Sequence, residues 1–176
     1  MTRLSDPCVL DFDVRQFTDA PLQMAGEFIF NASPEVVFDR VASPEGIVSW
    51  FPTLYAATGE HSASENGDTW GAGSKRYCNT RLMGTLNETI LYWHPPQAYA
   101  YSVKNWAMPI KDHCGVMIVE PWGAHQTRFI WHQYYTPVGL FLRYLFPAMM
   151  IYMMNQGLEQ LRQTLGGTGG QMRKVS

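Results

Sequence analysis

The feature that most constrains the fold is a series of short strand-like segments separated by turn residues. After a first alternating segment at residues 22–31, six more follow at a spacing of about ten residues: 54–62, 74–81, 85–94, 98–105, 113–120 and 127–135. The gaps between them are of hairpin length and rich in Gly, Pro, Asn and Asp. Evenly spaced strands with short connections are typical of an antiparallel meander. The sequence therefore predicts one antiparallel sheet of about seven strands.

Two helix-start signals separate the first strand from the meander. The tripeptide Ser-Pro-Glu occurs at 33–35 and again at 43–45. Serine suits the N-cap, proline the first helical position, and the acidic side chain the positive end of the helix. We therefore expect one short helix at 34–42 and a second that ends near Trp50.

The last predicted element is a long helix at 137–165, with a kink or break at Pro147, which cannot donate a backbone hydrogen bond. Residues 140–154 are apolar on every side except at Arg143, so this half needs a cover all round. The apolar run 138–154 has 17 residues, fewer than the ~20 that span a bilayer. We therefore expect a buried helix and no transmembrane segment.

A chain of 176 residues is the right length for a single domain. We expect the domain at 21–166, preceded by an N-terminal arm at 1–20. The glycine-rich, basic residues 167–176 are expected to be a disordered tail. The arm is acidic and shows no secretory signal.

Composition excludes several classes of function. The net charge of −2 gives no basic field, so nucleic acid is not an expected partner. The three cysteines form no CxxC pair and the five histidines have no metal-site spacing, so we expect no metal and no cofactor. Unpaired cysteines without a signal peptide indicate reduced thiols in a cytoplasmic protein.

Five sequence pieces in a fixed order carry a family resemblance: ASPEVVF at 32–38, SPE at 43–45 leading to a tryptophan, GAGS at 71–74, ETI at 88–90 leading to PP and YAY at 95–101, and EPWG at 120–123 leading to TRFIW at 127–131. With them, the chain resembles the START/Bet v 1-like (SRPBCC) superfamily, and most closely its polyketide cyclase/dehydrase and lipid-transport branch. The resemblance implies an α+β helix-grip fold: a curved sheet, two short helices, and a long C-terminal helix over a cavity for an apolar ligand. It does not imply catalysis, because the same fold serves carriers, sensors and enzymes.

Candidate ligand-binding residues lie on the helices and strands around the expected cavity. Methionine is flexible and polarisable, and aromatic rings can stack on a ligand or close a portal. Ordinary core packing, or an outward orientation on the sheet, is the alternative for each. The candidates are Trp50, Phe51, Tyr77, Arg81, Glu88, Tyr101, Trp131, Phe146, Met149, Met150 and Met153.

Four of the polar side chains on strands are also catalytic candidates: Arg81, Glu88, Tyr101 and His132. Such groups could polarise a ketone or transfer protons. If Glu88 is buried it needs a partner such as Arg81. Strand alternation separates Tyr77 and Arg81 from Arg76 and Cys78, but the sequence does not show which set faces inward.

Three functions remain open. The favoured one is binding or carriage of a lipid, an isoprenoid or an aromatic polyketide-like molecule, because the chain is rich in aromatic residues and methionine. The second is an aromatase/cyclase or dehydratase that uses the four catalytic candidates. The third is an interaction module, in which the apolar helix at 140–154 is covered by the arm at 1–20, by a second subunit in a homodimer, or by a membrane surface. Arg143 either lies along the surface or binds an anionic head group.

Overall fold

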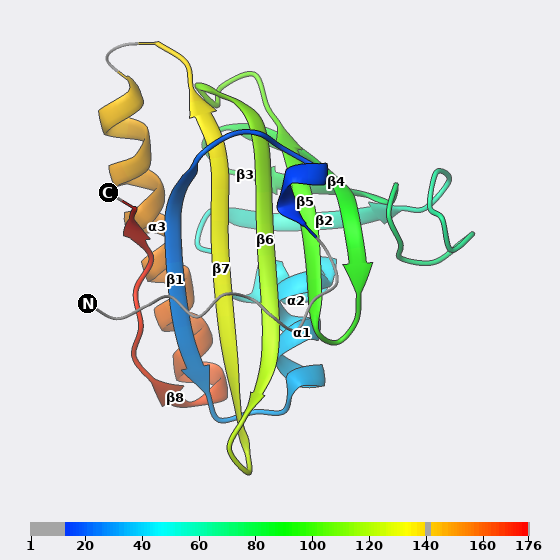
Figure 1. The fold of residues 1–176 in the computed structure, drawn as a ribbon, viewed down its shortest axis with the longest axis vertical. Helices are drawn as coiled ribbons and strands as arrows, with labels where there is room; N and C mark the ends of the chain where they lie inside the picture. The colour runs from blue at the N-terminus through cyan, green and yellow to red at the C-terminus, as the bar shows by residue number, and fades with distance from the viewer. Residues whose placement is uncertain (1–12, 140–141, 176) are drawn as a thin grey trace.

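The computed structural model describes residues 13–139 and 142–175, without the side chains of 142–144. It shows an α+β fold in which a strongly curved, open sheet wraps around helices on its concave side (Figure 1). The strand order is β2-β3-β4-β5-β6-β7-β1-β8, and β9 also pairs with β1. All neighbouring strands are antiparallel. The predicted helix-grip fold is confirmed.

The seven long strands match the seven predicted segments. Their bounds are Leu22–Phe30 for β1, Leu54–Glu60 for β2, Lys75–Thr80 for β3, Gly84–His94 for β4, Ala98–Lys104 for β5, Ile110–Trp122 for β6 and Gln126–Pro137 for β7. Strands β5 and β6 are buried on both faces along much of their length, whereas β7 largely alternates between buried and partly exposed residues.

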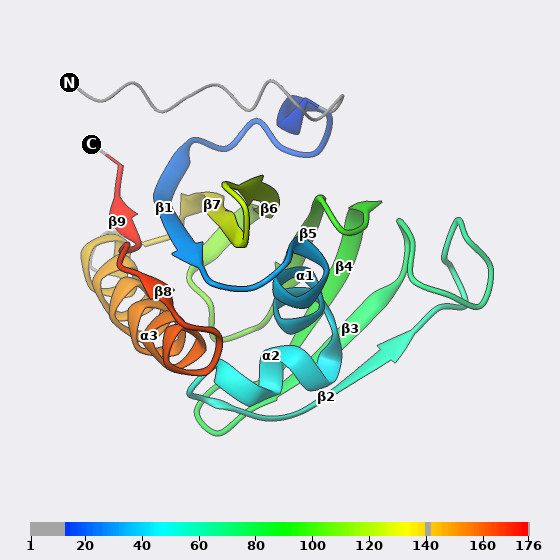
Figure 2. The same ribbon diagram turned by 90° about the horizontal axis from the view of Figure 1, so that it is seen from below.

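The two short helices also form where the Ser-Pro-Glu signals place them, α1 at Pro34–Ala42 and α2 at Pro44–Trp50. The Ser43 hydroxyl caps α2, accepting from the Gly46 N–H at 2.9 Å. Seen from below, α1 and α2 lie under the curve of the sheet, and α3 runs alongside β1 (Figure 2). The helices thus close the concave side and leave the pocket described below between themselves and the sheet.

The long helix α3, Leu142–Leu165, differs from its prediction in two ways. It starts later than residue 137, because β7 continues to Pro137, which lies at a strand end where a missing N–H costs nothing. It also continues through Pro147 as one unbroken helix. Pro147 lies near the N-terminus of α3, so only the bond to the carbonyl of residue 143 is lost.

Two apolar clusters hold the layers together. The larger one fills the concave side between sheet and helices and includes Phe129, Trp50 and Leu161, each no more than 1% exposed. The smaller one lies on the convex face of β5, β6 and β7, where Val14 and Phe17 pack against it. The described part of the predicted arm, 13–20, therefore covers the outside of the sheet and contains a short 3-10 helix at Val14–Gln16. Residues 1–12 lie outside the described part of the chain.

The C-terminal segment differs from the predicted disordered tail. Residues 167–168 form β8 and 173–174 form β9, and both pair with the free edge of β1. Met172 between them is 1% exposed and exchanges two hydrogen bonds with the Asn155 side chain, at 2.8 and 3.1 Å. A sheet edge offers unpaired N–H and C=O groups, and this segment satisfies them despite its glycine content.

No helix in residues 13–139 and 142–175 is both long enough and apolar enough to cross a membrane.

Candidate functional site

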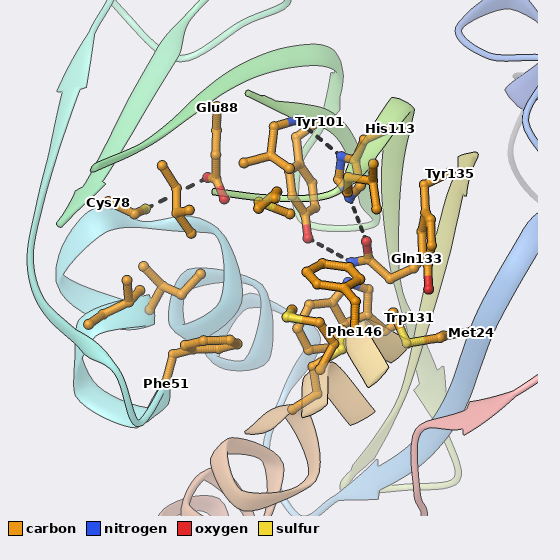
Figure 3. A pocket seen from close by; sticks show the side chains of 18 residues that line it. Met24, Phe51, Cys78, Glu88, Tyr101, His113, Trp131, Gln133, Tyr135 and Phe146 are labelled. Atoms are coloured by element: carbon orange, nitrogen blue, oxygen red, sulfur yellow. Dashed lines mark hydrogen bonds between the residues drawn. The ribbon is translucent and has the colours of Figure 1, made fainter. Parts of the chain in front are cut away.

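A pocket opens between the concave face of the sheet, α2 and the N-terminal half of α3 (Figure 3). The cavity has a volume of about 60 Å³. Eighteen side chains line it: Met24, Ile47, Phe51, Leu54, Cys78, Leu86, Glu88, Tyr101, Val103, Met108, Ile110, His113, Trp131, Gln133, Tyr135, Phe146, Met150 and Met154. The wall is mainly apolar and carries a few polar groups, which is typical of small-molecule sites.

The first polar group is the Glu88 carboxylate, which extends into the pocket from β4 (Figure 3). Its Oε2 accepts a hydrogen bond of 2.5 Å from Nε of Arg76, and the two side chains are 6% and 0% exposed. Arg76 also donates to the Ala42 carbonyl at 2.6 Å, at the C-terminal end of α1. Its remaining Nη2 has no hydrogen-bond partner among the described residues. The Arg76–Glu88 pair therefore connects β3, β4 and α1 beneath the pocket wall.

Burial alone would lower the pKa of Arg76, but the adjacent Glu88 carboxylate, together with Tyr99 and Cys78, raises it well above its ordinary value. The guanidinium therefore stays charged and neutralises Glu88. Cys78 lies beside them, with its thiol 3.8 Å from Glu88 Oε2, and burial raises its pKa. This thiol stays protonated near neutral pH and is a poor nucleophile.

The second polar group is a chain of three side chains from neighbouring strands (Figure 3). His113 Nδ1 accepts from the Val103 N–H at 3.0 Å, and its Nε2 lies 2.6 Å from Gln133 Oε1. Gln133 Nε2 then donates to the Tyr101 hydroxyl at 2.9 Å. Burial lowers the pKa of His113 to about 4 and raises that of Tyr101, so both are uncharged at neutral pH.

Gly115 makes room for the Tyr101 ring. The two residues are directly paired between β5 and β6, and a Cβ on Gly115 would overlap the ring carbons and the hydroxyl of Tyr101. Only glycine therefore lets the tyrosine lie across the neighbouring strand and bring its hydroxyl to Gln133.

The structure brings six of the predicted binding residues to the pocket wall: Phe51, Glu88, Tyr101, Trp131, Phe146 and Met150. Glu88 and Tyr101 are also two of the four catalytic candidates. Whether these side chains contact a ligand stays a prediction.

The other candidates lie elsewhere. Trp50 is 1% exposed in the core, where its indole donates to the Arg40 carbonyl, and Met153 is also buried away from the pocket. Tyr77 faces outward and donates to Glu60. Met149 is 40% exposed. His132 lies on the opposite face of β7 from Trp131 and Gln133.

Arg81, the expected partner of Glu88, is exposed beyond the end of β3 and lies over the Tyr55 ring. That pairing is wrong, because Arg76 faces inward on the same strand and forms the bond. The side chain of Arg143 lies outside the described residues.

Lining residues with polar side-chain atoms that are not among the predicted binding residues include Cys78, His113 and Gln133. Cys78 was considered with the correct face of β3, but the face could not be chosen. His113 and Gln133 acquire their role through strand pairing, and the polar neighbours of each in the sequence, Asp112 and His132, leave neither of them singled out. Within the described ranges no three His, Cys, Asp or Glu side chains group in a way that could hold a metal ion.

The curved sheet that grips a long helix above an apolar pocket defines the helix-grip class of α+β proteins. The family model "Polyketide cyclase / dehydrase and lipid transport" matches residues 22–166, most of the chain. The chain belongs to this family. Membership supports a general role in binding a hydrophobic ligand. No curated protein matches the chain.

Solved structures with the same fold share little sequence with this chain. The protein XoxI from Bacillus cereus is 17% identical, with a TM-score of 0.65 over 82% of this chain and 96% of that one. A Thermobifida fusca protein is 18% identical, with a TM-score of 0.66 over 82% and 93% of the two chains. An HSP90 activator from Plasmodium falciparum is 11% identical, with a TM-score of 0.62 over 84% and 99%. At these identities the likeness shows the fold alone.

Proposed function

We propose that the chain binds or carries a hydrophobic small molecule in the pocket between β4, β5, β7, α2 and α3. The observation that carries the proposal is an apolar wall interrupted at one side by neutralised or uncharged polar groups, Glu88, Tyr101, Gln133 and His113. The cavity is about 60 Å³ in volume, well below the roughly 300–1,000 Å³ of typical ligand sites.

Because the cavity is this small, a large guest needs movement of the pocket wall. Four lining residues are methionines, Met24, Met108, Met150 and Met154, whose side chains adopt new rotamers at little cost. Lipids, isoprenoids and aromatic polyketide-like molecules are therefore all within the proposed range, and small aromatic molecules need the least rearrangement.

Binding of the neutral fluorophore N-phenyl-1-naphthylamine tests the proposal. Val103 lines the pocket, and Ser102 before it points to the other side of β5. We expect fluorescence enhancement with the wild-type protein, loss of affinity by at least about tenfold in Val103→Phe, and no change in Ser102→Phe. Equal binding by all three proteins would refute a site in this pocket.

Enzymatic proton transfer has less support from the geometry. Both nitrogens of His113 are engaged, and burial raises the pKa of the Tyr101 hydroxyl. Arg81 and His132, two of the four catalytic candidates, lie away from the pocket. The polar groups are therefore better arranged to orient a ligand than to exchange protons with it.

The homodimer through α3 stays a prediction. Leu145, Met149 and Tyr152 lie on the outer side of α3 and are 57%, 40% and 66% exposed. Sedimentation equilibrium of the wild type and a Tyr152→Glu variant measures it: a dimer that the variant dissociates supports it, and a wild-type monomer contradicts it. The cytoplasmic location also stays a prediction.

A further inference from the structure

The hydrogen-bond chain at the pocket wall has a fixed direction. The Val103 N–H can only donate, so the Nδ1 of His113 that accepts it carries no hydrogen. Burial holds His113 in its neutral form at neutral pH, with a pKa of about 4, so the single ring hydrogen is on Nε2. That nitrogen therefore donates to Gln133 Oε1, at 2.6 Å.

The orientation of Gln133 then determines the role of Tyr101. With its oxygen facing His113, the amide donates from Nε2 to the Tyr101 oxygen at 2.9 Å. The hydroxyl hydrogen of Tyr101 is left over, and no described residue accepts it. A buried hydroxyl without an acceptor costs free energy, because it has lost its hydrogen bond to water. The chain thus ends in an unused donor at the pocket, with the ring 5% exposed.

The charged side chains at the pocket wall further restrict the chemical class of the ligand. Among the described lining residues there is no Lys or Arg, and the one carboxylate, Glu88, is neutralised by Arg76 behind it. An anionic ligand would meet no compensating cation among the described lining residues and would lie near the Glu88 carboxylate. Desolvating an uncompensated charge is far costlier than desolvating a neutral carbonyl.

We propose that the ligand of this pocket is a neutral, mainly apolar molecule with a carbonyl-type oxygen, such as an aromatic ketone or a quinone, which accepts a hydrogen bond from the Tyr101 hydroxyl. This assignment rests on the proposed binding function and adds the chemical class of the ligand. It excludes pure hydrocarbons and carboxylates as preferred ligands.

Three naphthalenes of similar size provide the test, each measured by displacement of N-phenyl-1-naphthylamine. They are 2-acetylnaphthalene, which has the acceptor, 2-ethylnaphthalene, which lacks it, and 2-naphthoate, which is an anion. We expect the ketone to bind about 3- to 10-fold more tightly than the hydrocarbon, the increment of one neutral hydrogen bond. The carboxylate is expected to bind most weakly.

Two substitutions locate the donor. Tyr101→Phe should abolish the preference for the ketone while leaving affinity for the hydrocarbon within about twofold. Tyr134→Phe, on the opposite face of β7, should leave the preference unchanged. Tyr135 also lines the pocket with an unpartnered hydroxyl. If Tyr135→Phe removes the preference and Tyr101→Phe does not, the assignment of the donor is overturned.

The proposed function and this inference fail in different ways. If the fluorophore binds independently of Val103, the pocket is not the site and the proposed function fails. If the fluorophore binds in the pocket but the ketone binds no better than the hydrocarbon, or the carboxylate binds best, the function stands and the ligand class is wrong.

Discussion

The buried ion pair of Arg76 and Glu88 makes a strong prediction for stability. In Glu88→Gln, the fully buried guanidinium of Arg76 keeps its charge but loses the carboxylate 2.5 Å away. Removing one partner of a buried pair costs about 3–5 kcal/mol of unfolding free energy, because the other charge remains uncompensated. The pair Arg162–Glu159 on α3 is the matched control, with side chains 40% and 48% exposed. Loss of an exposed pair costs about 0–1 kcal/mol, so Glu159→Gln should be nearly neutral.

Urea unfolding followed by far-UV circular dichroism measures both variants. A double variant, Arg76→Met with Glu88→Leu, separates charge from packing, because it removes the pair without leaving an isolated ion. We expect it to cost less than the sum of its two single substitutions, although it also loses the bond to the Ala42 carbonyl. The reasoning is refuted if Glu88→Gln costs no more than Glu159→Gln, or if the two single costs simply add.

Three further predictions concern single residues. Gly115→Ala should destabilise the fold by about 1–3 kcal/mol and weaken ligand binding, because the new Cβ displaces the Tyr101 ring; unchanged unfolding and affinity would contradict this. Burial lowers the pKa of His113 to about 4, so between about pH 6.5 and 4 this histidine is protonated in the unfolded chain but not in the folded chain. The unfolding free energy should therefore fall by roughly 3 kcal/mol as the pH drops through this range. Urea titrations should show this loss in the wild type and less of it in His113→Gln. Met172→Ala should cost about 2–5 kcal/mol and expose the amides of residues 167–175 to hydrogen exchange, whereas a tail independent of the fold would show neither.

Most of the architecture could be predicted because it depends on local signals. The Ser-Pro-Glu signals define where α1 and α2 begin, and turn residues between alternating segments define the seven long strands. The same logic failed at Pro137, where a cap-and-proline pattern ends a strand, because strand pairing with β6 overrides a local helix signal. Prediction from local sequence also failed for residues 167–176, because their glycine content does not show that β1 has a free edge with which they can pair.

The polar side of the pocket was harder to predict because its members meet only through strand register. Arg76 and Arg81 are equally plausible partners for Glu88 in the sequence, and the choice depends on which face of β3 turns inward. Register places Arg76 directly opposite Glu88, whereas Arg81 lies beyond the end of β3. Neither the pair nor its depth can be derived without knowing how the sheet curves around the helices.

The ion pair and the directional hydrogen-bond chain meet at one ring, so stability and recognition should be coupled. The Arg76 guanidinium carbon lies 5.9 Å from the centre of the Tyr101 ring, within the range of a cation–π contact, and Tyr101 is the last donor of the chain. Arg76 therefore supports the ring from one side while Gly115 leaves space for it on the neighbouring strand. In Glu88→Gln the Arg76 guanidinium lacks its compensating carboxylate, so we expect it to shift and the Tyr101 ring to shift with it. The variant should then lose part of its preference for ketones over hydrocarbons even at temperatures where it is fully folded, which a purely structural ion pair would not cause.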